Sequence, residues 1–293
     1  MSAESKINNV SLVSYNAMST SSSYLPTYLG QAATSEDYFL TLDDNNFCHQ
    51  RYHKYRAQST MAPTLYHVPR TISSPIVQIL LELGVKDVNI ETLTFAELKS
   101  PAHLARNPMG SSPAFTDEDN GIAIWESGAV LTYLLETYDT QHKFHPKQGT
   151  ATPLERANFL HLQQYIIATV YPFLASLFLQ TLKPEHEQDQ GYISSAKEKW
   201  LTLLAPTLTG FLGGQPFFMG NAISSIDFLI AKPLNNAKSL DLLEQFPDLD
   251  ALFKRVSCMP SFAKAYDMEE RTKDCSGCTK DCTECRSLVL LPN

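Results

Sequence analysis

The sequence predicts an α/β domain followed by an all-helical domain. Between residues 64 and 138, short apolar strand candidates alternate with helix-like stretches, an order typical of a small mixed sheet flanked by helices. After residue 146 no strand pattern returns, and apolar residues recur at helical spacing. We therefore expect four regions: an extension over residues 1–60, an α/β domain over residues 61–146, a helical domain over residues 147–268 and a cysteine-rich tail over residues 269–293.

Composition excludes several classes of protein. Apolar residues make up 43% of the 293-residue chain and charged residues 18%, which permits a sizeable core and excludes wholesale disorder. The formal net charge is −8 and no run of Lys or Arg occurs, so the basic face of a nucleic-acid-binding protein is missing. Six cysteines are too few for a disulfide-framed secreted module. We expect a soluble cytoplasmic protein.

The N-terminal extension does not decide between a cytoplasmic and an organellar location of the protein. Residues 1–60 have weak periodicity and many small polar side chains, which predicts a poorly ordered segment without the apolar region of a secretory signal. Residues 1–35 hold one acidic residue, Glu4, as in an organellar presequence, but no Arg precedes Arg51, which such a presequence would contain. An organellar location therefore stays an alternative, and Met61 is a second plausible start beside Met1.

One apolar stretch reaches the lower limit of length for a membrane span. Residues 165–182 carry no charge over 18 positions. Pro172 lies near its middle, and Thr169 and Ser176 add polar groups. Because a helix buried between layers of an all-helical domain has the same composition, we expect a core helix and no membrane span.

Local signals place each element of the α/β domain. Residues 64–67 form a strand candidate, and Ser74 directly before Pro75 is the expected helix N-cap. The helix that follows has an apolar stripe and stops at Gly84. Further on, the pattern predicts a strand over residues 88–93, a hairpin over residues 114–125 and a helix over residues 127–138.

The helical domain is expected to contain four main helices. Ser224 and Asp227 have the spacing of a capping box, which predicts the start of the third of them. The expected helices cover residues 154–182, 194–212, 226–237 and 249–256.

Three segments resemble a known family. Residues 107–115 (NPMGSSPAF) and 125–134 (WESGAVLTYL) resemble motifs in the N-terminal domain of cytosolic glutathione transferases, and residues 65–74 (LYHVPRTISS) resemble its first strand and loop. The Ser224/Asp227 pair is similar to a capping box of its helical domain. The resemblance implies a thioredoxin-like glutathione-binding domain, an all-helical C-terminal domain and a homodimer, with serine- or threonine-type chemistry and the class unassigned.

The resemblance also implies a glutathione site. A cis peptide bond at Ser112-Pro113 would expose the Ser112 N–H and C=O to the backbone of the tripeptide. Ser127, at a helix N-terminus with free N–H groups, would bind the γ-glutamyl carboxylate, and Glu126 would bind the ammonium group. A trans proline that begins a strand, and a serine that only caps a helix, are the ordinary structural alternatives.

A loop hydroxyl is the expected catalytic group. A free thiol has a pKa of about 8.5, and a hydroxyl that donates to the sulfur stabilises the thiolate. With Ser74 as the expected N-cap, Ser73 is the first choice, Thr71 the second and Ser74 the third, and backbone N–H groups alone are a further alternative. No cysteine occurs between Cys48 and Cys258, which argues against mixed-disulfide chemistry in this loop.

The second substrate, a small apolar electrophile, would lie between the domains. The resemblance and the apolar stretch suggest a lining from Val68, Tyr165, Thr169 and Tyr171. The aromatic residues among these fit a helical core equally well. The eight histidines show no metal-ligand spacing and receive no role.

The tail departs from the family pattern. Its four thiolates could hold Zn²⁺ or another thiophilic metal, or an iron–sulfur cluster, although the short spacer makes one site cramped. Oxidisable free thiols, and a tail without a function, stay open. The residues concerned are Cys275, Cys278, Cys282 and Cys285.

Three functions are compatible with these features. The preferred one is a glutathione transferase that adds glutathione to apolar electrophiles or reduces organic peroxides as a glutathione peroxidase. The alternative is a non-catalytic binding or assembly module on the same fold. The third, a zeta-like maleylacetoacetate isomerase, requires more of a serine–cysteine loop than residues 71–74 contain.

Overall fold

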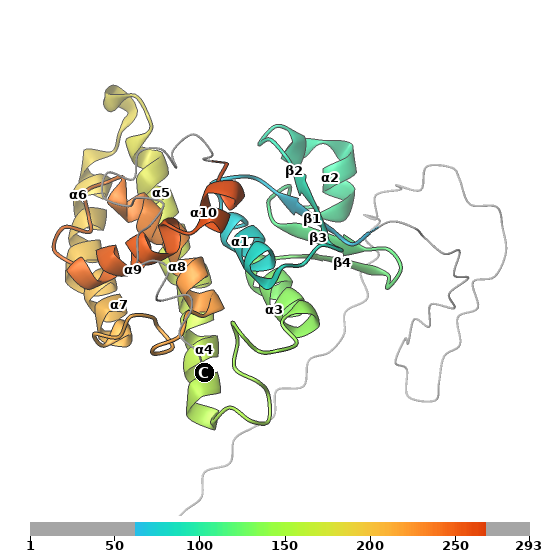
Figure 1. Ribbon diagram of the computed structural model, residues 1–293. Coiled ribbons are helices and arrows are strands. Elements are labelled where there is room, and N and C mark those ends of the chain that lie inside the picture. Colours follow the sequence, from blue (N-terminus) through green and yellow to red (C-terminus); the bar gives the residue numbers. More distant parts are fainter. Residues whose placement is uncertain (1–61, 268–293) are drawn as a thin grey trace, which may run out of the picture. The chain divides into compact units, whose positions relative to one another are not determined.

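A four-stranded mixed sheet forms the centre of the N-terminal part. The structure is a computed structural model that describes residues 62–267 (Figure 1). The strand order is β2-β1-β3-β4, with β1 parallel to β2 and antiparallel to β3, and β3 and β4 form a hairpin. The elements are β1 (Thr64–His67), α1 (Ser74–Leu83), β2 (Asn89–Thr92), η1 (Glu97–Lys99), α2 (Pro101–Arg106), β3 (Ala114–Asp117), β4 (Ile122–Trp125) and α3 (Ser127–Tyr138).

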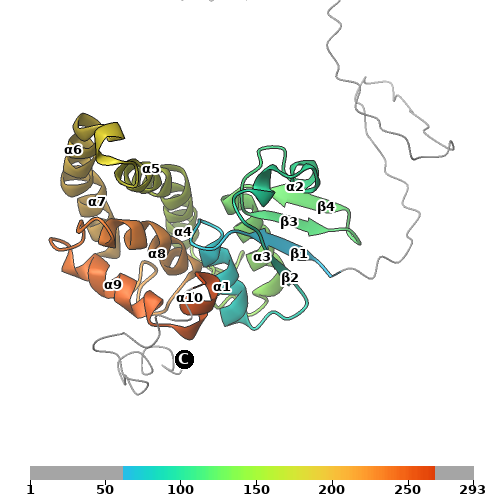
Figure 2. The ribbon, with the colours of Figure 1, turned by 90° about the horizontal axis from the view of Figure 1, so that it is seen from above.

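Strand alternation covers both faces of the sheet. Leu65 and Phe115, paired across β1 and β3, point into the main core, which also holds residues of α1 and α3. Their neighbours Tyr66 and Ala114 point to the other face, where they form a smaller buried cluster with Leu98 of η1. Figures 1 and 2 show α1 and α3 on one side of the sheet and α2 on the other. The predicted α/β order is confirmed.

The C-terminal part is mostly helical, as predicted. α4, η2 and α5 follow one another without a break, as do α6, η4 and α7. The elements are α4 (Pro153–Tyr165), η2 (Ile166–Val170), α5 (Tyr171–Thr181), η3 (Glu185–Glu187), α6 (Gln190–Lys199), η4 (Trp200–Leu204), α7 (Ala205–Leu212), α8 (Ser225–Lys238), α9 (Pro247–Ser257) and α10 (Pro260–Ala265). The boundary expected near residue 146 falls between α3 and α4.

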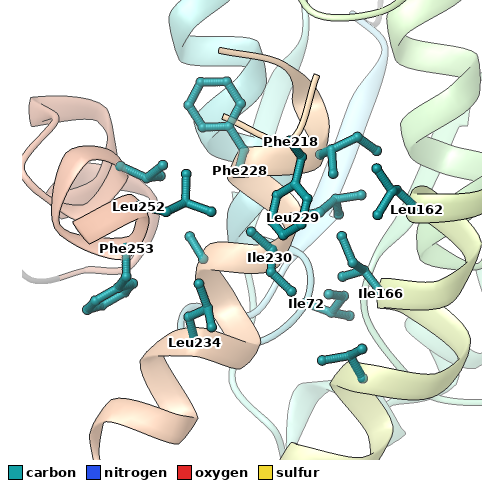
Figure 3. Close-up of a cluster of buried hydrophobic side chains, with 14 of the residues drawn as sticks. Ile72, Leu162, Ile166, Phe218, Phe228, Leu229, Ile230, Leu234, Leu252 and Phe253 are labelled. Carbon is teal, nitrogen blue, oxygen red and sulfur yellow. The ribbon is translucent and has the colours of Figure 1, made fainter. Parts of the chain in front are cut away.

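Helix α8 is the centre of the helical core and packs against α1, α5 and α9. Its side chains Phe228 and Ile230 are fully buried. Figure 3 shows them in one apolar cluster with Ile166 of η2 and with Ile72, which lies in the connection between β1 and α1. Ile72 therefore anchors that connection in the core of the helical part.

The predicted capping box at the start of α8 is confirmed. The Asp227 carboxylate accepts hydrogen bonds from the Ser224 N–H at 2.7 Å and from the Ser224 hydroxyl at 2.8 Å. It also accepts from the Phe218 N–H at 2.8 Å, so it fixes the loop before the helix. Burial raises the pKa of Asp227 to about 6, although these hydrogen bonds favour the charged form.

Three expectations need correction. Ser74 is the first residue of α1 and not its N-cap, because its Oγ accepts a hydrogen bond from the Arg70 N–H at 2.9 Å. Helix α6 begins at Gln190 and not at residue 194, because the Asp189 side chain caps its first turn. The helix expected to be buried between layers is largely exposed, because only 33% of its most apolar window is buried. By length and composition alone, this helix, Pro153–Thr181, could cross a membrane.

Candidate functional site

The β1–α1 connection places three hydroxyls close together, and Ser73 is the most enclosed of them. Its side chain has no exposed surface. Ser73 Oγ lies 2.8 Å from His67 Nδ1 and 2.8 Å from Thr71 Oγ1. It also lies 3.0 Å from the Val68 carbonyl oxygen and accepts from the Val68 N–H at 3.2 Å. Ser73, the first choice from the sequence, is therefore fully engaged inside the protein.

Thr71 is the more accessible hydroxyl. Its side chain is half-buried, and Oγ1 lies 2.8 Å from the Val68 carbonyl oxygen. Ser74 is fully buried and bonded to the Arg70 N–H. Of the three expected catalytic hydroxyls, Thr71 alone has exposed surface, while the role of each stays a prediction.

No sequence pattern predicts a role for His67, yet its ring contacts Ser73 of this loop. Its ring is buried, and burial lowers the pKa of His67 to about 4. A hydrogen bond with the Ala265 backbone and the negative charge of Asp267 act in the opposite direction but are weaker. The ring is therefore neutral near pH 7 and joins β1, the loop and the end of α10.

A second unforeseen contact ties the same loop to the end of α10. Arg70 has a positive φ of 64°, and its guanidinium donates to the Tyr266 carbonyl at 3.3 Å and to the Asp267 carbonyl at 3.0 Å. Only the chain's tertiary folding could reveal this contact, because 196 residues separate Arg70 from Tyr266.

The peptide bond between Ser112 and Pro113 is cis, as the resemblance implied. Ser112 Oγ accepts from the Val68 N–H at 3.1 Å, so the Val68 N–H is shared between the Ser112 and Ser73 hydroxyls. The preceding carbonyl, of Ser111, is held by Asn107 Nδ2 at 2.8 Å. The cis-proline segment and the connection between β1 and α1 (residues 68–73, the hydroxyl loop) therefore both bond the Val68 N–H.

Glu126 and Ser127 lie where β4 runs into α3, also as expected. Glu126 is exposed and occupies the N-cap position with φ 78° and ψ 122°, a conformation that side chains other than Gly rarely adopt. Ser127 begins the helix and is 8% exposed, and its hydroxyl bonds to none of residues 62–267. The free N–H groups of this first turn suit an anionic group.

Replacing Glu126 with Gly should separate stability from ligand binding. Relief of the positive φ should stabilise the fold by about 1 kcal/mol, or roughly 3 °C in melting temperature. Loss of the carboxylate should weaken glutathione binding about tenfold, the effect of one charged hydrogen bond. Glu126→Ala is the matched control, because it loses the carboxylate but keeps the backbone strain. Thermal melting and calorimetric titration measure both effects, and equal melting temperatures for the two variants would contradict the strain.

The residues expected to line a second substrate site do not all lie together. Val68 is buried beside the hydroxyl loop, and the Tyr171 phenol hydrogen-bonds the backbone of Ile72 in that loop. Tyr165 instead faces α7, where its ring lies 6.1 Å from that of Phe211. Thr169 is exposed. Val68 and Tyr171 therefore adjoin the hydroxyl loop, and the lining itself stays a prediction.

The four tail cysteines lie outside the described residues, as does the N-terminal extension. Within residues 62–267, no group of three or more His, Cys, Asp or Glu side chains is placed to hold a metal ion. The proposed metal site on the tail therefore stays a prediction.

Comparison with known sequences assigns both parts of the chain. Residues 61–136 match the N-terminal domain of glutathione S-transferase, and residues 169–266 match its C-terminal domain. A glutathione S-transferase of Drosophila melanogaster is 27% identical over 198 residues, 66% of this chain and 86% of the relative. A glutathione S-transferase-like protein of Beauveria bassiana is 31% identical over 158 residues, 52% of this chain and 68% of the relative.

Solved structures share the fold. A glutathione transferase from Phanerochaete chrysosporium, crystallised with oxidized glutathione, superposes with a TM-score of 0.62 at 24% identity. The match covers 73% of this chain and 98% of that one. The sheet domain and the helical part thus agree with the two domain matches, and the chain belongs to the glutathione S-transferase family.

Proposed function

We propose that the protein is a glutathione transferase that joins glutathione to small apolar electrophiles. The observation that carries the proposal is the turn into α3. An exposed carboxylate is held there in a strained conformation beside a serine hydroxyl that bonds to no described residue. Strain of this kind persists where the surroundings impose it and is concentrated at functional sites. The Phanerochaete chrysosporium relative, which was solved with oxidized glutathione, supports the choice of ligand.

The γ-glutamyl end of glutathione and its peptide backbone each have a complementary group in the proposed site. The γ-glutamyl carboxylate would accept from the Ser127 hydroxyl and from N–H groups of the first turn of α3. The ammonium group would pair with Glu126, and the backbone of the tripeptide would bond the Ser112 N–H and C=O. This arrangement would point the thiol towards the loop that carries Thr71 and Ser73.

The reaction needs a thiolate at neutral pH. The thiol loses its proton to solvent, and a loop hydroxyl donates a hydrogen bond to the sulfur, which favours the anion. The sulfur lone pair then forms a carbon–sulfur bond with the electrophile, and a leaving group departs with its bonding electrons. Holding both reactants side by side would supply much of the rate.

A glutathione titration followed by thiolate absorbance tests the proposal. In the wild type we expect the pKa of bound glutathione to fall at least one unit below the free value of about 8.5. Ser127→Ala should weaken binding about tenfold, because the carboxylate loses a charged hydrogen bond. Ser176→Ala, which removes a hydroxyl of α5 that accepts a hydrogen bond from the Tyr192 hydroxyl of α6, is the matched control and should leave binding unchanged.

The same titration separates the proposal from its rival. Binding without a lowered pKa, and without turnover of electrophiles or organic peroxides, would favour a non-catalytic binding module. Absence of binding would contradict the role of Glu126 and Ser127. The complete burial of Ser73 favours the non-catalytic binding module, since this hydroxyl has no free surface for a ligand.

We further propose that the protein acts in the cytoplasm as a homodimer. Apolar side chains left on the surface of the helical part support an association between copies. Leu160 is 40% exposed and Phe211 is 36% exposed.

A further inference from the structure

The hydrogen bonds of Ser73 determine which loop hydroxyl is able to act on glutathione. A serine hydroxyl has one proton, but Ser73 Oγ lies within hydrogen-bond distance of three groups that could accept it: His67 Nδ1, Thr71 Oγ1 and the Val68 carbonyl oxygen. The Val68 N–H donates to the same oxygen. Once Ser73 donates its single proton to one of these groups, it has none left for a ligand, whereas Thr71 keeps its own hydroxyl proton.

His67 is the acceptor that the surroundings favour. A neutral imidazole carries its proton on one nitrogen and accepts through the other, and the partner of one nitrogen fixes the state of the other. The Ala265 backbone hydrogen-bonds the His67 ring in the direction that favours protonation, as a carbonyl does. Since Nδ1 faces Ser73 at 2.8 Å, the protonated nitrogen is Nε2, and Nδ1 offers a lone pair to the Ser73 hydroxyl.

We propose that His67 holds the Ser73 proton, which makes Ser73 a structural residue and leaves Thr71 as the hydroxyl that donates to the glutathione sulfur. The inference rests on the proposed function. Burial agrees with it, because Ser73 has no exposed surface whereas Thr71 is half-buried. In the structure the Thr71 hydroxyl lies 2.8 Å from the Val68 carbonyl oxygen, and rotation about one bond redirects its proton.

Nitrogen-15 NMR of the full chain tests the first half of the proposal without glutathione. The spectrum should show the His67 ring, assigned by its disappearance in His67→Asn, as the Nε2–H tautomer near pH 7. A ring protonated at Nδ1 would donate to Ser73 and would overturn the proposal.

The thiol pKa of bound glutathione tests the second half. Thr71→Val, which preserves shape, should return that pKa to near the free value of about 8.5. Ser73→Ala should change it by less than about 0.3 unit, and Thr71→Ser, which restores the hydroxyl, should keep the wild-type value. A loss of the shift in Ser73→Ala, or its survival in Thr71→Val, would overturn the assignment of Thr71.

The outcomes also distinguish a failure of this inference from a failure of the proposed transferase function. A wild type that binds glutathione without lowering its pKa overturns the proposed function and the donor role of Thr71 together, whatever the tautomer of His67. A wild type that lowers the pKa, with Thr71→Val unchanged, overturns only the present inference. Thermal melting of each variant shows whether it is folded. If Thr71→Val does not fold, Thr71→Ser still tests the assignment.

Discussion

Asp227→Ala should lower the free energy of unfolding by about 3 kcal/mol. The carboxylate is fully buried and accepts from the Ser224 N–H, the Ser224 hydroxyl and the Phe218 N–H. Alanine leaves both N–H groups buried without an acceptor, at about 1–3 kcal/mol each, while the relief of a buried charge offsets part of that cost. The melting temperature should fall by roughly 10 °C.

Two further variants identify the cause of that loss. Asp227→Asn keeps one acceptor oxygen and should destabilise by about half as much. Asp250→Ala removes an acid on the surface that pairs with Lys238 at 2.7 Å and Lys254 at 2.9 Å, and should cost less than about 1 kcal/mol. Chemical denaturation measures all three. A loss at Asp250 equal to that at Asp227 would show that general charge effects, and not the buried hydrogen bonds, are responsible.

Acidification should destabilise the fold through His67. The folded pKa of about 4 lies below the ordinary value of 6.5, so the unfolded chain binds the proton more readily. The contribution of His67 is complete above pH 6.5 and is lost as the pH falls to 4, and it amounts to about 3 kcal/mol. His67→Asn should gain that amount relative to the wild type over this interval. His186→Asn, whose ring is 80% exposed, is the control and should follow the wild type.

Between pH 6 and pH 4, protonation of Asp227 should raise the stability of the fold, whereas protonation of His67 lowers it. The pKa of Asp227 rises from 3.8 to about 6 on folding, so between pH 6 and pH 4 the folded protein binds the proton more readily than the unfolded chain. Protonation there stabilises the fold by about 3 kcal/mol, and Asp227→Asn should lose that gain relative to the wild type. Opposite pH slopes for the two variants, measured by denaturation from pH 7 to pH 4, are the expected result. Parallel slopes would contradict at least one of the two assignments.

Much of the fold could be predicted because its signals are local. Gly84 ends α1 in a left-handed conformation, and the acidic turn before Gly121 closes the hairpin. Ser224 and Asp227 mark the start of α8. Each signal involves residues within a few positions, where propensity and pattern operate. The predicted N-cap role of Ser74 is wrong because its hydroxyl accepts from the Arg70 N–H, a contact that depends on the path of the loop.

The chemistry of the candidate site depended on contacts that no local pattern contains. The positions of Glu126, Ser127 and the cis Pro113 followed from family motifs, and the structure places all three as expected. The preference for Ser73 over Thr71 ignored His67, because a single histidine in a strand carries no signal of its bonding partner. The exposure of one side of Pro153–Thr181 could not be predicted from the sequence either, since uncharged residues suit both a core and a surface.

The attachment of the hydroxyl loop to Tyr266 and Asp267 has a consequence for the order of events during synthesis. The strand and loop leave the ribosome early, whereas the carbonyls that hold Arg70 follow 196 and 197 residues later. The α/β part could therefore fold first, as N-terminal parts commonly do, but with its loop unsecured. The loop would then reach its final position only after α10 has been made and has docked, so its geometry is completed by the last helix of the described chain.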